Sequence, residues 1–155
     1  MIGNDIVDLA EASQNSNWTR PRFLDKLFTL QEQGLIQNSA DSFLMVWILW
    51  CMKEAAYKLY TQLYPGRFYN PKQFECETKE ELGKVNYKDF SCFIKTKVTA
   101  QYVLSEARLS EMDMISECIK LNNNSPKYQS DKVKHTLLSK IAEHYTLCLL
   151  YTSPS

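Results

Sequence analysis

The fold of this chain depends on one stretch, residues 43–63, which reads FLMVWILWCMKEAAYKLYTQL. Phe43, Trp47, Trp50, Glu54 and Lys58 recur at the spacing of one helical face, so the pattern predicts a long helix with these side chains along a single stripe. Glu54 therefore lies in line with two tryptophans instead of on the polar side. Because a buried carboxylate without a partner is costly, this position requires a metal, a cation or several hydrogen bonds. The alternative is a surface pair between Glu54 and Lys58, which contributes only about 0.3–0.5 kcal/mol.

The rest of the chain predicts an α+β fold, in which the long helix packs on an antiparallel sheet. Pro65-Gly66 ends the long helix. The other expected helices are 22–28, capped by Thr19, then 29–37, opened by a capping box of Thr29 and Glu32, and 132–145. The expected strands are 1–9, 74–77, 83–87, 91–98 and 101–106.

The composition is that of an ordinary globular domain, with 45% hydrophobic and 23% charged residues. Eighteen basic and eighteen acidic residues leave no net charge, which argues against general binding to nucleic acid or to an anionic membrane. The longest apolar run, residues 43–52, is too short to span a bilayer. Five scattered cysteines and two histidines lack the spacing of a zinc site. Without a signal-peptide pattern at the start, the expected location is a reducing cytoplasm.

A second motif, Gly3-Asn4-Asp5-Ile6-Val7-Asp8, places a carboxylate just after a glycine in the first strand. Glycine permits close approach of the backbone to a neighbour there. Carboxylates that converge from distant segments can hold a hard cation such as Mg²⁺, and a nearby lysine can neutralise a phosphate. An aspartate in this place is also a common turn former or helix cap, and spacing alone does not show that Asp5 and Glu54 meet.

The two motifs together resemble the signature of the 4′-phosphopantetheinyl transferase superfamily, which includes holo-acyl-carrier-protein synthase. Its pattern is G-x-D, followed later in the chain by [FW]-x-x-K-E-x-x-x-K. The positions that match it in order, within residues 1–65, are Gly3, Asp5, Trp50, Lys53, Glu54 and Lys58. The resemblance implies an enzyme of lipid or polyketide-type biosynthesis that moves 4′-phosphopantetheine from coenzyme A to a serine of an acyl carrier protein.

The same resemblance implies a role for each matching residue. Asp5 and Glu54 would bind Mg²⁺, while Lys58 would contact the phosphates of coenzyme A, with Lys53 as a second coenzyme A-binding residue beside it. Glu54 and Lys58 would be catalytic, with Glu54 helping to deprotonate the acceptor serine. These roles agree with the chemistry, because transfer of this kind depends mainly on positioning and on neutralisation of charge.

A small basic cluster lies between the two motifs. Arg20, Arg22 and Lys26 occupy the segment near which the family docks the acidic helix of its carrier protein, and complementary charge speeds such encounters. The alternative is an ordinary solvated helix face. The resemblance therefore implies an acyl carrier protein and coenzyme A as partners, and no nucleic acid or membrane.

The chain departs from the family pattern in two places. The larger enzymes have a second acid two residues after the signature aspartate, where this chain has Val7, and a Ser-x-[ST]-His strand is not found. Residues 148–155, CLLYTSPS, resemble the translation of an adapter from sequencing libraries. Compared with the family, we therefore expect one incomplete transferase domain over residues 1–147, without its final strand, and a tail that is not native. Two other functions stay open: a different Mg²⁺-dependent phosphoesterase, or a non-catalytic interaction module.

Overall fold

The computed structural model describes residues 1–66, 68–111 and 116–152, with the side chains of residues 144–152 left out. The chain divides into two compact units, residues 1–113 and 114–155. Both signature motifs lie in the first unit. One incomplete domain over residues 1–147, a missing final strand and a foreign tail at 148–155 are not tested by these observations and stay predictions.

Helix α4 (Ser42–Leu63) is the long helix that the sequence predicts. Asp41 begins it by accepting a hydrogen bond from the N–H of Leu44 at 2.9 Å, as an N-cap residue does. At the other end the N–H of Tyr64 bonds the carbonyl of Tyr60. Pro65 follows, and because proline cannot continue the pattern of helical hydrogen bonds, the helix ends there.

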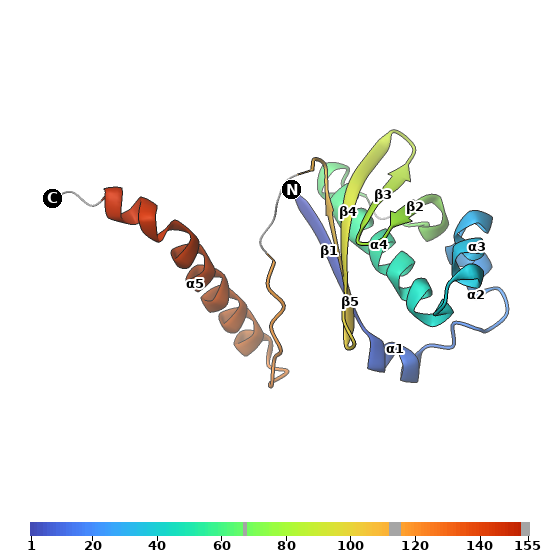
Figure 1. The fold of residues 1–155 in the computed structure, drawn as a ribbon, viewed down its shortest axis with the longest axis horizontal. Coiled ribbons are helices and arrows are strands. Elements are labelled where there is room, and N and C mark those ends of the chain that lie inside the picture. The colour runs from blue at the N-terminus through green and yellow to red at the C-terminus, as the bar shows by residue number, and fades with distance from the viewer. Residues whose placement is uncertain (67, 112–115, 153–155) are drawn as a thin grey trace. The chain divides into compact units, whose positions relative to one another are not determined.

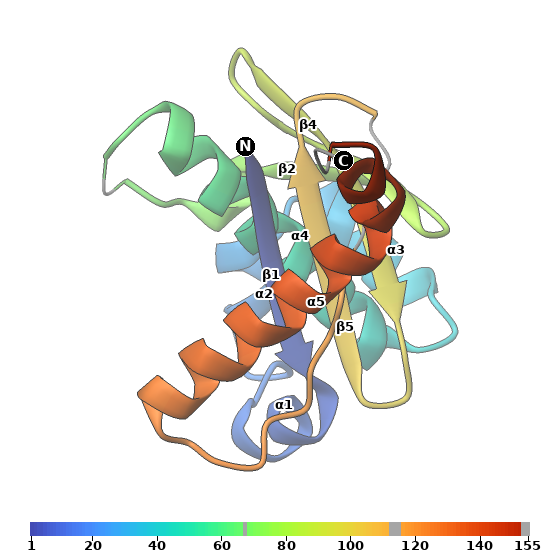
Figure 2. The same cartoon turned by 90° about the vertical axis from the view of Figure 1, so that its left-hand side faces the viewer.

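Five strands form one antiparallel sheet in the order β1-β5-β4-β3-β2 (Figure 1). Their bounds are β1 (Ile2–Asp8), β2 (Glu75–Lys79), β3 (Leu82–Tyr87), β4 (Phe90–Val98) and β5 (Tyr102–Arg108). Strands β2 to β5 follow one another as a meander, and β1 pairs with β5 at one edge (Figure 2). The predicted α+β class is confirmed, and so is each predicted strand, with small differences at the ends.

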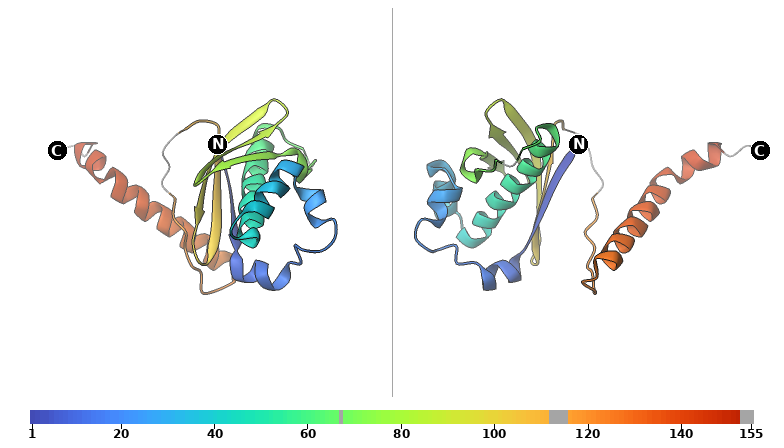
Figure 3. Two further views of the ribbon diagram at one scale, coloured as in Figure 1. Left: turned by 45° about the vertical axis from the view of Figure 1, so that its right-hand side comes forward. Right: turned by 180° about the vertical axis from the view of Figure 1, so that it is seen from behind.

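Helix α4 packs on one face of the sheet, as the two rotated views show (Figure 3). Side chains alternate between the two faces of a strand, so every second residue points toward the helix. Val85, Ile94 and Ala107 are buried in this way in one cluster with residues of α4 such as Leu49, and Val103 is buried on the same face of β5 as Ala107. This single apolar layer between helix and sheet is the core, and it fixes β1 against the middle of α4.

Short helices complete the described part of the first unit: α1 (Leu9–Asn15), α2 (Phe23–Leu27), α3 (Leu30–Asn38) and the 3₁₀ turn η1 (Pro71–Gln73). The capping box of Thr29 and Glu32 at the start of α3 is confirmed. The predicted Thr19 cap is wrong, because the residue at the N-cap of α2 is Arg22, which makes no capping bond. The sequence does not predict α1, because only Ala12 in it is buried and no apolar periodicity marks it.

The second unit contains helix α5 (Pro126–Thr152), which extends the predicted helix 132–145 at both ends. Within this unit Lys140 pairs with Glu117 at 3.8 Å and with Glu143 at 3.6 Å. Across the described residues, no helix combines the length and the apolar character needed to cross a membrane. The cytoplasmic location stays a prediction.

Candidate functional site

Two carboxylates border one groove at the junction of β1 and α4. Asp5 comes from the middle of β1 and Glu54 from the middle of α4, and the groove that both line has a volume of about 480 Å³. Trp47 and Trp50 line it as well, which confirms that Glu54 lies in line with the two tryptophans. The structure therefore brings together the two acidic residues that sequence spacing alone leaves apart.

The carboxylates come together because β1 packs directly on the backbone of α4. A Cβ at Gly3 would overlap the carbonyl oxygen of Ala55 and would lie 2.6 Å from the amide nitrogen of Leu59. Asp5 is the next residue of β1 on the same face, since side chains alternate along a strand. The predicted close approach at Gly3 is confirmed, and it sets how near Asp5 comes to the helix that carries Glu54.

Two side chains of α4 hold the backbone of β1 in place. The Cys51 thiol donates a hydrogen bond to the carbonyl of Asp5 at 3.1 Å, and the Gln62 amide donates to the carbonyl of Ile2 at 2.8 Å. Burial raises the pKa of Cys51 to about 12, so the thiol keeps the proton that it donates. No sequence signal marks either residue for this role, because neither belongs to a charged motif.

Lys58 pairs with Asp5. Its Nζ lies 2.7 Å from Oδ1 of Asp5, and the side chains are 48% and 16% exposed. Among the described residues no ion pair joins Lys58 to Glu54, so the alternative of an ordinary pair along the helix is wrong. An ion pair this exposed contributes about 0–1 kcal/mol, so the ammonium can turn toward a ligand in the groove at little cost.

Glu54 has an environment that disfavours its charge. Burial raises the pKa of Glu54 above the usual carboxyl value; the Tyr69 hydroxyl opposes the rise, the Asp5 charge adds to it, and Lys58 opposes it. Burial and a second negative charge are the two effects that a cation in the groove would offset. The ionised form of Glu54 would therefore be stabilised by a bound cation.

Tyr69, from the segment between α4 and η1, brings a phenol to Glu54. Its ring stacks on Tyr57 of α4 with the ring centroids 4.1 Å apart. The hydroxyl is buried and makes no hydrogen bond of good geometry to a described residue. It lies close enough to Glu54 that the phenol lowers the pKa of Glu54 and the carboxylate raises the pKa of Tyr69. The contact is therefore long or poorly aligned, and the hydroxyl has a proton left to donate. No motif in the sequence points to Tyr69.

Lys53 does not line the groove. Its ammonium is fully buried and donates to Oε1 of Glu32 at 2.8 Å, to the carbonyl of Pro71 at 3.0 Å and to the carbonyl of Phe74 at 2.6 Å. These three bonds use all three protons of the ammonium. The predicted role of Lys53 in binding coenzyme A is therefore corrected, because the group has no donor left for a phosphate.

The basic cluster is accessible. Arg20, Arg22 and Lys26 are all exposed, but only Lys26 belongs to a helix, α2. The guanidinium of Arg20 lies over the ring of Phe23, 5.3 Å from its centroid. Exposure leaves these charges free to meet a partner, and their role in docking stays a prediction.

The groove has an acidic lining that fits a hard cation. Asp5, Asp8, Glu11 and Glu54 border it, and no lysine or arginine does so among the described residues. The Asp8 carboxylate caps α1 by accepting the N–H of Glu11 at 2.9 Å, which leaves Asp5 and Glu54 as the opposed pair. Within the part of the chain that is described, no group of three or more His, Cys, Asp or Glu could hold a metal. Two carboxylates with water suit Mg²⁺, which commonly keeps several waters.

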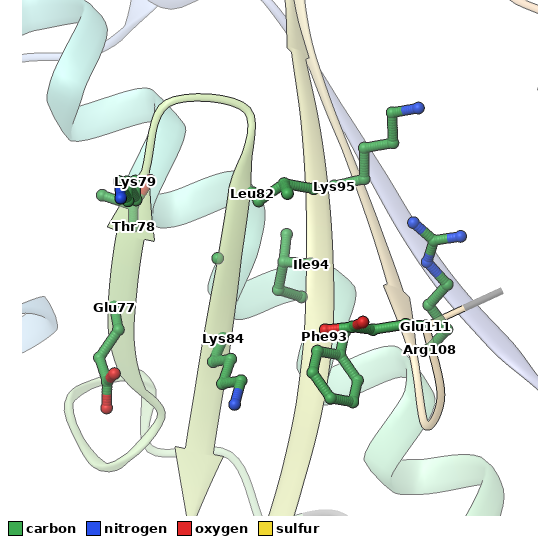
Figure 4. A pocket seen from close by; sticks show the side chains of 11 residues that line it. Glu77, Thr78, Lys79, Leu82, Lys84, Phe93, Ile94, Lys95, Arg108 and Glu111 are labelled. Carbon is green, nitrogen blue, oxygen red and sulfur yellow. The ribbon is translucent and has the colours of Figure 1, made fainter. Parts of the chain in front are cut away.

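A larger cavity than this groove lies elsewhere. It has a volume of about 650 Å³ and is built on strands β2 to β5, with Lys84, Phe93, Lys95, Arg108 and Glu111 among its lining residues (Figure 4). None of the residues that match the signature pattern contributes to it. The smaller acidic groove is therefore the candidate site, because Asp5, Trp50 and Glu54 of the signature pattern line it.

Solved structures with a similar fold are small synthases. The chain resembles an apo-ACPS structure from Chronobacterium ammoiniagenes (TM-score 0.57, 16% identity, covering 69% of this chain and 93% of that chain). It also resembles Helicobacter pylori holo-[acyl-carrier-protein] synthase in complex with coenzyme A (0.56, 16%, 71% and 100%). A third is holo-[acyl-carrier-protein] synthase from Neisseria meningitidis (0.55, 12%, 68% and 94%). At these identities the likeness shows the fold.

No curated protein matches the chain. A family model described as the 4′-phosphopantetheinyl transferase superfamily matches residues 1–109, which is most of the chain and includes both signature motifs. With the fold of these synthases and the convergence of Asp5 with Glu54, this match identifies the chain: it belongs to the 4′-phosphopantetheinyl transferase superfamily and is an enzyme of that class.

Proposed function

We propose that this enzyme transfers 4′-phosphopantetheine from coenzyme A to a serine of an acyl carrier protein, with Mg²⁺ as its metal, in lipid biosynthesis. The observation that carries the proposal is the convergence of Asp5 and Glu54 at one groove, with Lys58 paired to Asp5, in a chain of this superfamily. A structural relative from Helicobacter pylori is described in complex with coenzyme A, which supports coenzyme A as the donor.

Asp5 and Glu54 are the proposed ligands of the metal. Their oxygens are the ligand type that Mg²⁺ prefers, and the raised pKa of Glu54 is the mark of a carboxylate that lacks a compensating cation. The bound ion would supply neutralisation of negative charge on the pyrophosphate of coenzyme A. Lys58 would add a positive charge from the rim, where its half-exposed ammonium can leave Asp5 for a phosphate oxygen.

The reaction makes one bond and breaks one. The serine oxygen forms a bond to the phosphorus that carries pantetheine, the bond from that phosphorus to the leaving phosphate breaks, and adenosine 3′,5′-bisphosphate departs with the electron pair. Glu54 is the proposed acceptor of the serine proton, because it is a carboxylate that borders the groove in which the acceptor serine would have to lie. Arg20, Arg22 and Lys26 remain the proposed contacts for an acidic carrier protein.

The experiment is incorporation of labelled coenzyme A into an apo acyl carrier protein, with and without Mg²⁺. Asp5→Asn and Glu54→Gln should each reduce incorporation by at least a hundredfold, since each removes a charge but little volume. Glu75→Gln is the matched control, because Glu75 is an exposed carboxylate on β2 that does not line the groove. If the unmodified chain is active and both groove variants incorporate the label at the same rate, the assignment of the site is refuted.

A second measurement separates this function from that of another Mg²⁺-dependent phosphoesterase. Without a carrier protein, a transferase should release little adenosine 3′,5′-bisphosphate, because no acceptor serine is present. Rapid release of adenosine 3′,5′-bisphosphate without a carrier protein, together with no labelling when a carrier protein is added, would favour hydrolysis over transfer.

A further inference from the structure

A buried polar cluster ties together three segments next to the groove. Its members are Lys53 of α4, Glu32 of α3, and the backbone from Pro71 to Cys76. Besides the three bonds from Lys53, Oε1 of Glu32 accepts the N–H of Cys76 at 2.8 Å, and Oε2 accepts the N–H of Thr29 at 2.8 Å. Both charged side chains are nearly or fully inaccessible to solvent, so each bond is made in a medium of low polarity.

The cluster fixes the segment that begins two residues after Tyr69. The ammonium of Lys53 bonds the carbonyls of Pro71 and Phe74, which lie at the two ends of the turn η1. Tyr69 also packs edge-on against the ring of Phe74, with centroids 5.9 Å apart. The position of the Tyr69 phenol is therefore set from one side by this cluster and from the other by the stack on Tyr57.

Tyr69 in turn faces the carboxylate that the proposed function uses. Its ring stacks on Tyr57, which follows Glu54 by about one turn of α4. Its hydroxyl is buried, has no well-aligned partner among the described residues, and is close enough to Glu54 for the two groups to interact. A donor in this place can engage one carboxylate oxygen and leave the other for a metal. Outer-shell donors of this kind orient metal ligands, and their loss typically weakens metal binding by about 10–100-fold.

We propose that Tyr69 is a positioning residue for Glu54, and that the buried pair of Lys53 and Glu32 acts on the site through the segment that carries Tyr69. The inference rests on the proposed function, because it takes Glu54 as a metal ligand. It gives the consecutive residues Lys53 and Glu54 separate tasks. Glu54 faces the groove, while Lys53 holds the backbone that places a tyrosine beside Glu54.

The test is the affinity for Mg²⁺ alone, measured by calorimetry on the full chain without coenzyme A. Tyr69→Phe removes the hydroxyl and keeps the ring, so we expect a dissociation constant about tenfold higher with almost no change in melting temperature. Tyr64→Phe is the matched control, because Tyr64 is largely exposed and does not line the groove. It should leave the affinity unchanged.

A double-mutant cycle tests the path from the buried pair. Lys53→Met should lower the melting temperature and weaken Mg²⁺ binding to a similar degree as Tyr69→Phe. In the double variant, the loss of Mg²⁺ binding free energy should be much smaller than the sum of the losses in the two single variants, because Lys53 acts through Tyr69. If Lys53→Met does not fold, Glu32→Gln, which keeps the shape of the side chain, takes its place in the cycle.

The outcomes separate the two proposals. If the unmodified chain does not bind Mg²⁺ alone but still labels the carrier protein, only the inference fails. If it does neither, the proposed function fails as well. If the unmodified chain binds Mg²⁺ and Tyr69→Phe binds it equally well, only the positioning role of Tyr69 is overturned. Full additivity in the cycle, with both single variants weakened, would overturn the link from Lys53 to Tyr69.

Discussion

Replacement of Gly3 by alanine should destabilise the first unit severely. The added Cβ would overlap the carbonyl oxygen of Ala55 and would lie 2.6 Å from the amide nitrogen and 3.0 Å from the Cβ of Leu59. Two of these three neighbours are backbone atoms in the middle of α4, so no side chain can move aside to make room. The strand itself must shift away from the helix.

The expected cost lies at or above the upper end of what overpacking usually causes, about 3 kcal/mol. For a unit of this size, 1 kcal/mol corresponds to about 4 °C, so the melting temperature should fall by about 12 °C. Because Asp5 lies on the same face of β1, the shift should also weaken Mg²⁺ binding in the molecules that remain folded.

Gly34→Ala is the control for this prediction. Gly34 lies within α3 and a Cβ there would meet nothing within 4 Å. Alanine should stabilise that helix by about 0.5–1 kcal/mol, because it loses less conformational freedom on folding. Thermal unfolding followed by circular dichroism measures both variants. If Gly3→Ala melts within 2–3 °C of the unmodified chain, roughly the shift of a substitution costing under 1 kcal/mol, the close packing of β1 on α4 is not as described.

Two further predictions concern the charged groups of the groove. Glu54→Gln should raise the melting temperature at pH 7 without Mg²⁺. A carboxyl whose pKa is raised by folding makes the folded chain less stable as the pH increases through that pKa, so the gain from the substitution should vanish near pH 4. Mg²⁺ should stabilise the unmodified chain but not the variant. An equal difference at both pH values would contradict this explanation. Lys58→Ala should raise KM for coenzyme A by about 10–100-fold through loss of a charge-assisted bond, while the loss of its exposed pair with Asp5 should change the unfolding free energy by less than about 1 kcal/mol. An unchanged KM would show that Lys58 does not bind the phosphates.

The elements that sequence patterns predict well are those with strong periodicity. Helix α4 and the meander of strands carry regular apolar spacing over many residues, and the fold class follows from them. The two short helices that differ from expectation lack that signal: α1 has one buried residue, and α2 begins at Phe23, after an N-cap residue, Arg22, that makes no side-chain cap. Their positions depend on the segments around them more than on their own residues.

The signature pattern identifies residues but does not say which way each one points. Residues 53 and 54 are adjacent in the sequence, yet successive side chains on a helix differ by about 100° in direction. One of them therefore reaches the groove and the other reaches α3. In the sequence, Glu32 is already explained as part of a capping box. Only its position in the structure shows that it is also the buried partner of Lys53.

The same geometry explains why an acid can be kept at position 54 at all. A carboxylate on the apolar stripe of α4 weakens the fold unless charge or hydrogen bonds compensate it. In this chain the compensation within the protein is partial, since Lys58 bonds Asp5 and the Tyr69 hydroxyl is not well aligned. The part of the free-energy cost of burying Glu54 that the protein does not compensate is the part that a divalent cation can recover on binding. We therefore expect the groove to be more stable occupied than empty, and this difference is why we propose Asp5 and Glu54 as ligands of a metal and not as a structural pair.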